Sequence, residues 1–140
     1  MSADCLLDTN VLVYAVSRSP EARIKRAKAL ALIAAGGFGV SGQVLQEFYV
    51  TVTRKISTPL VPTDALEWIE QLAAQPFVPI DHTLVIRGIE FANRYKISYW
   101  DAAIVAAAEA LGARTLYSED LSHGQVYGSV TVRNPFLDAT

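Results

Sequence analysis

The chain has 140 residues, the size of one domain, and its 51% hydrophobic content supports a sizeable core, so we expect residues 1–140 to form a single domain. The formal net charge of −2 gives no overall basic field, so any nucleic acid must be met by a local feature. Its only cysteine, Cys5, excludes a disulfide within the chain and suits a reducing compartment. The N-terminus lacks a basic region and an apolar stretch long enough for a signal or a membrane span, so we expect a cytoplasmic protein.

The pattern of apolar residues predicts alternating strands and helices. Short apolar runs bounded by turn residues predict strands at 5–7, 38–41, 76–80, 114–117 and 130–132. Cap residues and helical spacing predict helices at 11–16, 20–35, 42–50, 63–75, 82–95 and 102–111. The prolines of the 76–80 run indicate an edge position or the end of a strand. This order predicts an α/β fold, a three-layer α/β/α sandwich around a mainly parallel sheet of roughly five strands.

Four acidic residues are placed by these elements toward one edge of the sheet. Asp8 and Asp120 follow strands, whereas Glu47 and Asp101 lie in the early turns of helices. Each has an ordinary structural interpretation: Asp8 as a helix cap, Glu47 as an exposed helical residue, and Asp101 in a capping box with Ser98. Brought together, however, the four carboxylates would repel one another and destabilise the fold unless a cation shares them.

The chemistry of these four side chains favours a hard metal ion. Oxygen donors without a Cys/His ligand set favour Mg²⁺ or Mn²⁺. The two histidines, His82 and His123, lack metal-ligand spacing, and we expect both at the surface. A bound ion would polarise a phosphodiester and activate water, and it would let an acidic protein receive a polyanion.

Four segments of the chain resemble the ordered motifs of the PIN-domain family: Leu6–Leu12, Ser41–Phe48, Tyr99–Ile104 and Leu116–Leu121. The size of the chain and the spacing of these motifs are similar to those of a VapC-type toxin of a type II toxin–antitoxin system. The resemblance implies a PIN-like fold and a metal-dependent endoribonuclease. It also implies a small VapB-type antitoxin as partner and a homodimer.

The same resemblance carries roles over to individual residues. It implies four catalytic acids: Asp8, Glu47, Asp101 and Asp120. Asp8, Asp101 and Asp120 would hold Mg²⁺ or Mn²⁺, while Asn10 and Ser118 would keep the site in shape. Many family members have Thr-x-Asp in the last motif. Here Ser118 keeps the hydroxyl, and Glu119 beside Asp120 leaves two choices for the fourth acid.

Basic and bulky apolar residues suggest further surfaces. Arg18, Arg23 and Arg26 belong to a basic run that is typical of a solvated helix face, and they are also the candidates for RNA binding. Two apolar groups, Phe48-Tyr49-Val52 and Trp68-Ile69-Leu72, fit either core packing or a surface for a dimer or an antitoxin.

Other functions of this fold class were weighed against the same residues. A phosphatase of the haloacid-dehalogenase type needs a second aspartate where Asn10 stands. A phosphorelay receiver needs a lysine near a strand end, but all four lysines fall on predicted helices or at their ends. The alternative function is a catalytically silent PIN-like module that binds RNA or a partner, although four acids without a metal would only destabilise it.

Overall fold

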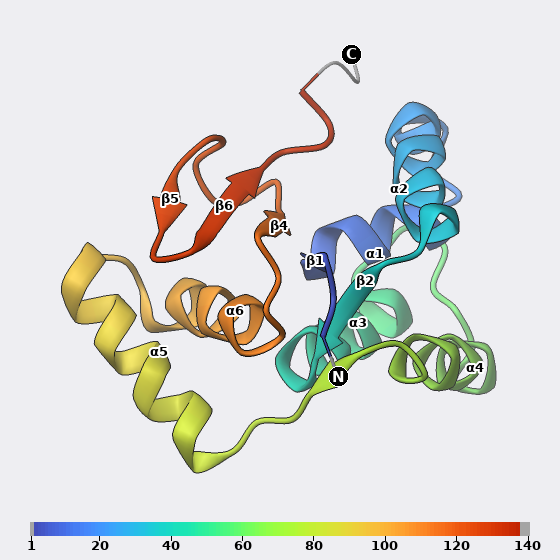
Figure 1. The fold of residues 1–140 in the computed structure, drawn as a ribbon. Helices are drawn as coiled ribbons and strands as arrows, with labels where there is room; N and C mark the ends of the chain where they lie inside the picture. Colours follow the sequence, from blue (N-terminus) through green and yellow to red (C-terminus); the bar gives the residue numbers. More distant parts are fainter. Residues whose placement is uncertain (1, 138–140) are drawn as a thin grey trace.

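The computed structural model describes residues 2–137, and in this range six strands form one sheet (Figure 1). The strand order is β3-β2-β1-β4-β6-β5. The strands are β1 (Cys5–Leu7), β2 (Phe38–Ser41), β3 (Phe77–Val78), β4 (Thr115–Tyr117), β5 (Val126–Tyr127) and β6 (Val130–Arg133). All neighbours pair in parallel except β5 and β6. The predicted mainly parallel sheet is confirmed, and β3 lies at its edge as the prolines indicated.

Helices cover both faces of the sheet, which confirms the three-layer sandwich. They are α1 (Thr9–Val16), α2 (Arg23–Ala35), α3 (Gly42–Arg54), α4 (Pro62–Ala73), α5 (His82–Tyr95) and α6 (Tyr99–Ala110), with a 3₁₀ turn η1 (Pro20–Ala22) before α2. The chain steps outward from β1 to β2 to β3, and then returns across the sheet to β4. Because crossover connections are right-handed, α1 to α4 lie on one face and α5 with α6 on the other (Figure 1).

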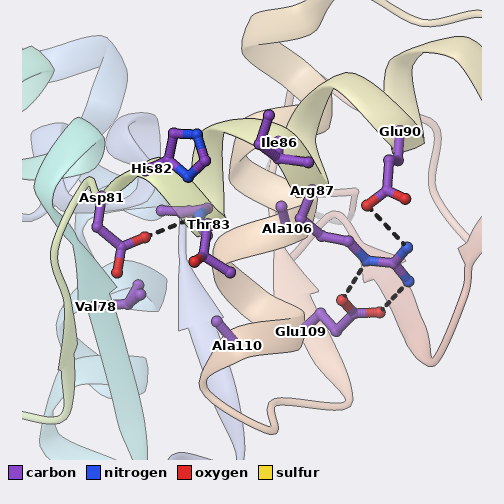
Figure 2. Close-up of a pocket in the computed structure, with 11 residues that line it drawn as sticks. Val78, Asp81, His82, Thr83, Ile86, Arg87, Glu90, Ala106, Glu109 and Ala110 are labelled. Atoms are coloured by element: carbon purple, nitrogen blue, oxygen red, sulfur yellow. Dashed lines mark hydrogen bonds and ion pairs between the residues drawn. The ribbon is translucent and has the colours of Figure 1, made fainter.

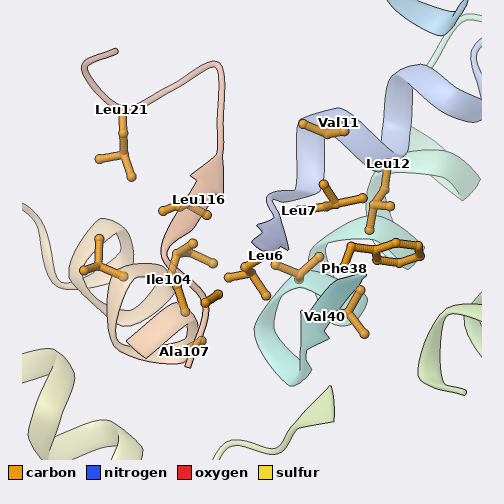
Figure 3. Close-up of a cluster of buried hydrophobic side chains, with 14 of the residues drawn as sticks. Leu6, Leu7, Val11, Leu12, Phe38, Val40, Ile104, Ala107, Leu116 and Leu121 are labelled. Carbon is orange, nitrogen blue, oxygen red and sulfur yellow. The ribbon is translucent and has the colours of Figure 1, made fainter. Parts of the chain in front are cut away.

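The core fills the space between the sheet and its helices. Figure 3 shows Leu6 and Leu116 from adjacent central strands facing Ile104 and Ala107 of α6. All residues of α6 from Ala102 to Ala108 are buried, because α5 covers the side of the helix that the sheet does not. Small alanine side chains allow this close approach. The central part of this helix is therefore enclosed between the sheet and α5.

Polar caps fix where the helices begin. Side-chain oxygens accept hydrogen bonds from backbone N–H groups of the first turn at the starts of α1, α3, α5 and α6; the capping residues are Asp8, Ser41, Asp81 and Ser98. Helices α1 and α3 begin directly after β1 and β2, and α6 runs antiparallel to the strand β4 that it precedes. The starts of α1, α3 and α6 therefore lie at the edge of the sheet where the parallel strands end.

The structure corrects some of the sequence-based boundaries. Strand β5 lies between the predicted strands at 114–117 and 130–132, where the apolar pattern predicts no strand, and Gly128, with a positive φ of 60°, turns the chain into β6. Helix α4 begins at Pro62 rather than at Thr63, because proline is well suited to the first helical position. No helix in the part of the chain that the structure describes is long and apolar enough to cross a membrane.

The apolar groups on α3 and α4 lie largely in the core. Phe48 and Val52 of α3 and Leu72 of α4 are buried, and Trp68 and Ile69 pack against them. Core packing therefore accounts for most of these residues.

Gly39 in β2 tests how tightly the sheet is packed. An added Cβ would lie 2.8 Å from Cδ1 of Leu111 and 3.0 Å from the carbonyl oxygen of Pro76. We expect Gly39→Ala to lower the free energy of unfolding by about 1–3 kcal/mol, measured by urea denaturation, because the backbone at Pro76 cannot yield. Gly42→Ala is the control: its Cβ would meet the exposed, movable side chain of Ile80 at 3.1 Å. Equal effects of the two changes would contradict this explanation.

Candidate active site

Asp8 is the buried acid of the site, with only 7% of its surface exposed. It ends β1 and caps α1, so its carboxylate is fixed by both elements. The backbone N–H of Thr9 donates to Oδ1 at 2.7 Å, and the hydroxyl of Ser118 donates to Oδ2 at 2.7 Å. Ser118 is fully buried at the end of the neighbouring strand β4. Two adjacent central strands therefore hold one carboxylate.

The surroundings of Asp8 disfavour its negative charge. The pKa of Asp8 is raised from 3.8 to about 6, chiefly by burial and, to a smaller extent, by the carboxylates of Asp120 and Glu47. The hydrogen bonds from Ser118 and Thr9 lower the pKa but do not offset burial. A cation beside Asp8 would favour the ionised form, so the site is suited to receive one.

Ser118 also organises the acidic turn after β4. Its oxygen accepts hydrogen bonds from the backbone N–H groups of Asp120 at 3.2 Å and Leu121 at 3.4 Å, while its O–H group donates a hydrogen bond to Asp8. The hydroxyl predicted to shape the site is thus shared between the two strand-end acids.

Asp120 and Asn10 form the second part of the site. Partial burial raises the pKa of Asp120, and so do the charges of Glu119 and Asp101, while the nearby Asn10 amide lowers it. The amide nitrogen and oxygen of Asn10 are both buried, yet the contact with Asp120 falls short of hydrogen-bond geometry. Buried amides without partners are rare in folded proteins, so this group is free to bind a ligand or water.

Glu47 and Asp101 complete the group of acids. The hydroxyl of Thr9 donates to Glu47 Oε2 at 3.1 Å, and the Gln43 amide donates to Oε1 at 2.9 Å. The same Gln43 amide donates to the backbone oxygen of Trp100 at 3.3 Å, directly before Asp101 in α6. The roles of Thr9 and Gln43 were missed from the sequence, because their polar contacts depend on how α1, α3 and α6 meet.

The four predicted acids therefore come within electrostatic reach of one another. Asp8 is influenced by Glu47 and Asp120, and Asp120 by Glu47 and Asp101. Among residues 2–137, no three His, Cys, Asp or Glu side chains are grouped closely enough to form a metal-binding set. The donor chemistry nevertheless fits a hard divalent ion, since it consists of carboxylate oxygens beside the unpartnered amide of Asn10.

The other predicted residues lie outside this group. Glu119 is bonded to Lys25 and Tyr14, and its charge acts on the neighbouring Asp120. Arg26 donates to the backbone oxygen of Ser17 at 3.2 Å, while Arg18 and Arg23 are exposed. His82 is exposed as expected, and His123 accepts a backbone hydrogen bond at 3.0 Å.

A hollow of about 470 Å³ between α5 and α6 is a separate feature (Figure 2). An ion pair lies among its lining residues: Arg87 donates to Glu109 from Nε at 2.7 Å and from Nη2 at 2.9 Å. None of the four acids lines the hollow. We therefore assign the candidate active site to the acids at the sheet edge, where hydrogen bonds and charges converge.

The protein is an α/β domain with a mainly parallel sheet. Its candidate site is acidic and lies at the edge of the sheet where β1 and β4 end. Residues 5–128 match the family model described as the PIN domain. The chain therefore belongs to the PIN-domain family. A search of curated proteins finds no significant match.

Solved structures share this fold at low sequence identity. A toxin–antitoxin complex from Klebsiella pneumoniae is similar with a TM-score of 0.69 and 18% identity, over 94% of this chain and 97% of that one. VapBC2 from Rickettsia felis, bound to a promoter DNA fragment, is similar with a TM-score of 0.65 and 19% identity, over 93% of this chain and 97% of that one. VapC20 from Mycobacterium tuberculosis, described as a toxin that cleaves the sarcin–ricin loop, is similar with a TM-score of 0.65 and 18% identity, over 83% of this chain and 89% of that one. These similarities establish the fold.

The raised pKa of Asp8 predicts a stabilising substitution. The pKa of Asp8 in the folded protein, about 6, exceeds the ordinary 3.8. The contribution of protonated Asp8 to the free energy of unfolding is therefore fully present below pH 3.8 and is lost as the pH rises through 6. In metal-free buffer, Asp8→Asn should therefore raise the free energy of unfolding near pH 8 by up to about 3 kcal/mol, with little gain near pH 4. Urea denaturation at both pH values measures this. Asp81→Asn, which alters the exposed cap of α5, is the control, and a pH-independent effect at Asp8 would contradict the prediction.

Proposed function

We propose that this chain is a divalent-metal-dependent endoribonuclease, the toxin of a VapBC-type toxin–antitoxin pair. The observation that carries the proposal is the buried carboxylate of Asp8, which is held by two strands and surrounded by acids that disfavour its charge. Such an arrangement destabilises the protein alone and becomes useful once a cation is bound. Membership of the PIN-domain family and the toxin structures that share the fold support the same function.

In this proposal, Asp8, Asp101 and Asp120 hold Mg²⁺ or Mn²⁺. The bound ion supplies Lewis-acid chemistry: it lowers the pKa of water and offsets charge on the phosphodiester. Asn10 and Ser118 support the acids, because Ser118 bonds Asp8 and the Asn10 amide lies beside Asp120.

Glu47 is the catalytic acid that orients the attacking water in the proposed reaction. Its two carboxylate oxygens are oriented by Thr9 and Gln43, and the side chain is exposed to solvent, so it can accept a hydrogen bond from an attacking water. The water oxygen forms a bond to phosphorus as the opposite P–O bond breaks, and its proton passes toward the carboxylate. The two hydrogen bonds keep the Glu47 side chain in one orientation for this step.

The proposed partners are an RNA substrate, a VapB-type antitoxin and a second copy of the chain. We propose that residues 1–140 form a single domain that binds these partners in the cytoplasm. Exposed apolar side chains near the ends of α3 and α4, such as Val50, Val61 and Leu66, offer surface for a protein partner.

RNA cleavage tests the catalytic acids. Wild-type protein should cut a pool of structured RNA in Mg²⁺ and not in EDTA. Asp8→Asn and Asp101→Asn should each lower the rate at least about 1000-fold, because a metal ion contributes several kcal/mol of transition-state stabilisation. Asp81→Asn also converts an acid to an amide, but it lies outside the site and should cut at the wild-type rate.

The same experiment separates the nuclease from the silent binding module. Normal cutting by Asp8→Asn would overturn the site assignment. If no protein cuts after a copurified inhibitor has been excluded by denaturation and refolding, a PIN-like module that only binds RNA or a partner becomes the better description.

Arg18 and Arg23 are the candidates that remain exposed for RNA binding. In an Asp8→Asn background, which prevents cleavage, replacing both with alanine should weaken binding of labelled single-stranded RNA. It should also reduce the slope of log affinity against log salt by about 1.4, since each phosphate contact contributes about 0.7. Fluorescence anisotropy across a salt series measures both. Arg94→Ala, on α5 at the other face of the sheet, is the control, and equal slopes for both proteins would exclude these arginines.

A further inference from the structure

Two consecutive acids follow β4, and the structure treats them differently. Glu119 is hydrogen bonded by the hydroxyl of Tyr14 at 2.8 Å and by Nζ of Lys25 at 2.5 Å. Asp120 has no cationic partner within the described residues, and partial burial together with the charges of Glu119, Asp101 and Glu47 raises its pKa. One acid is therefore neutralised, and its neighbour is left free at the candidate active site.

Lys25 is held more firmly than an ordinary surface lysine. It lies in the first turn of α2 with 29% of its side chain exposed, and the Glu119 side chain is 26% exposed. Its ammonium lies 4.8 Å from the centre of the Tyr14 ring and 5.7 Å from that of Phe136, and these two rings pack edge to face at 5.0 Å. Aromatic contacts on a partly desolvated ammonium restrict its position, and its nitrogen also donates to the Tyr14 hydroxyl at 3.2 Å.

The turn that carries both acids is thereby anchored on two sides. Ser118 ties it to Asp8 on one side, and Glu119 ties it to α1 and α2 through Tyr14 and Lys25 on the other. Because Glu119 and Asp120 are adjacent, fixing the first side chain restricts the backbone that directs the second. The charge of Glu119 acts on Asp120, and the ammonium of Lys25, bonded to Glu119, offsets part of that charge.

We propose that Lys25, together with Tyr14, is a positioning residue: it anchors and neutralises Glu119, so that Asp120 is the acid of this pair that faces the cation. The inference rests on the proposed function of the four acids. It assigns Asp120 as the fourth acid and gives Glu119 a structural role.

Direct binding of Mn²⁺ tests the inference without relying on catalysis. Isothermal titration calorimetry on the full chain should show Lys25→Met binding Mn²⁺ about tenfold more weakly than wild type, because residues that orient metal ligands contribute at least that much. Lys25→Arg, which keeps the charge, should bind nearly as wild type. Lys25→Met with Glu119→Gln should recover most of the loss, because the uncompensated charge is gone and Tyr14 can still donate to the amide oxygen. In RNA cleavage, the KM for RNA should stay unchanged.

Arg87→Met is the matched control for a loss of stability. It breaks another partly exposed Lys/Arg–carboxylate pair, with an N–O distance of 2.7 Å (Figure 2). Its partner Glu109 lies eight residues beyond Asp101 on α6, about 12 Å along the helix axis. This variant should lower the melting temperature about as much as Lys25→Met does, and it should leave Mn²⁺ binding unchanged.

The outcomes distinguish this inference from the function on which it rests. If wild type binds Mn²⁺ and Asp8→Asn does not, but Lys25→Met binds as wild type, only the role of Lys25 is overturned. It is also overturned if Arg87→Met weakens Mn²⁺ binding as much as Lys25→Met, since general destabilisation then explains both. If wild type neither binds Mn²⁺ nor cuts RNA, the proposed function fails and the positioning role fails with it.

Discussion

The hydrogen bond between Ser118 and the buried carboxylate of Asp8 joins the two central strands of the sheet at the edge where both end. Its geometry requires β1 and β4 to be neighbours, although 110 residues separate the two side chains. The return of the chain from β3 across the sheet, by way of α5 and α6, makes them neighbours. The same return places the start of α6, and with it Asp101, at this edge. The topology therefore assembles the site from four distant segments.

Electrostatic repulsion is the constraint that this assembly creates. A folded protein gains nothing from a desolvated carboxylate near other acids, and the hydrogen bonds to Asp8 only partly relieve it. Only one acid of this region forms an ion pair: Glu119 is paired with Lys25. Asp8, Asp101 and Asp120 have no basic partner among the described residues, so the site stays open. A protein that only bound a partner would have no use for this selective neutralisation, which favours a site for a cation.

The sequence alone was sufficient to predict that the acids lie at strand ends and near helix starts. Helix caps, short apolar runs and helix-ending glycines are local signals that can be read from neighbouring residues. The sequence was insufficient for contacts that depend on packing. Gln43 joins Glu47 to the start of α6, and nothing in its local sequence distinguishes it from Gln46. The choice between Glu119 and Asp120 was likewise open, because the difference arises from Lys25, 94 residues away. Strand β5 was missed because two residues are too few to show a period.

The basic run on α2 illustrates why a charge pattern does not translate directly into a binding surface. Its residues have separate partners: Lys25 neutralises Glu119, and Arg26 holds the backbone at Ser17. Arg18 and Arg23 alone remain exposed among the candidates for RNA. Since Lys25 and Arg23 share the first turn of α2, one short segment carries both an exposed arginine and the anchor of the Glu119–Asp120 turn. A basic run in a sequence is therefore divided between internal charge pairing and exposed surface, and the packing of the helix decides which residue has which role.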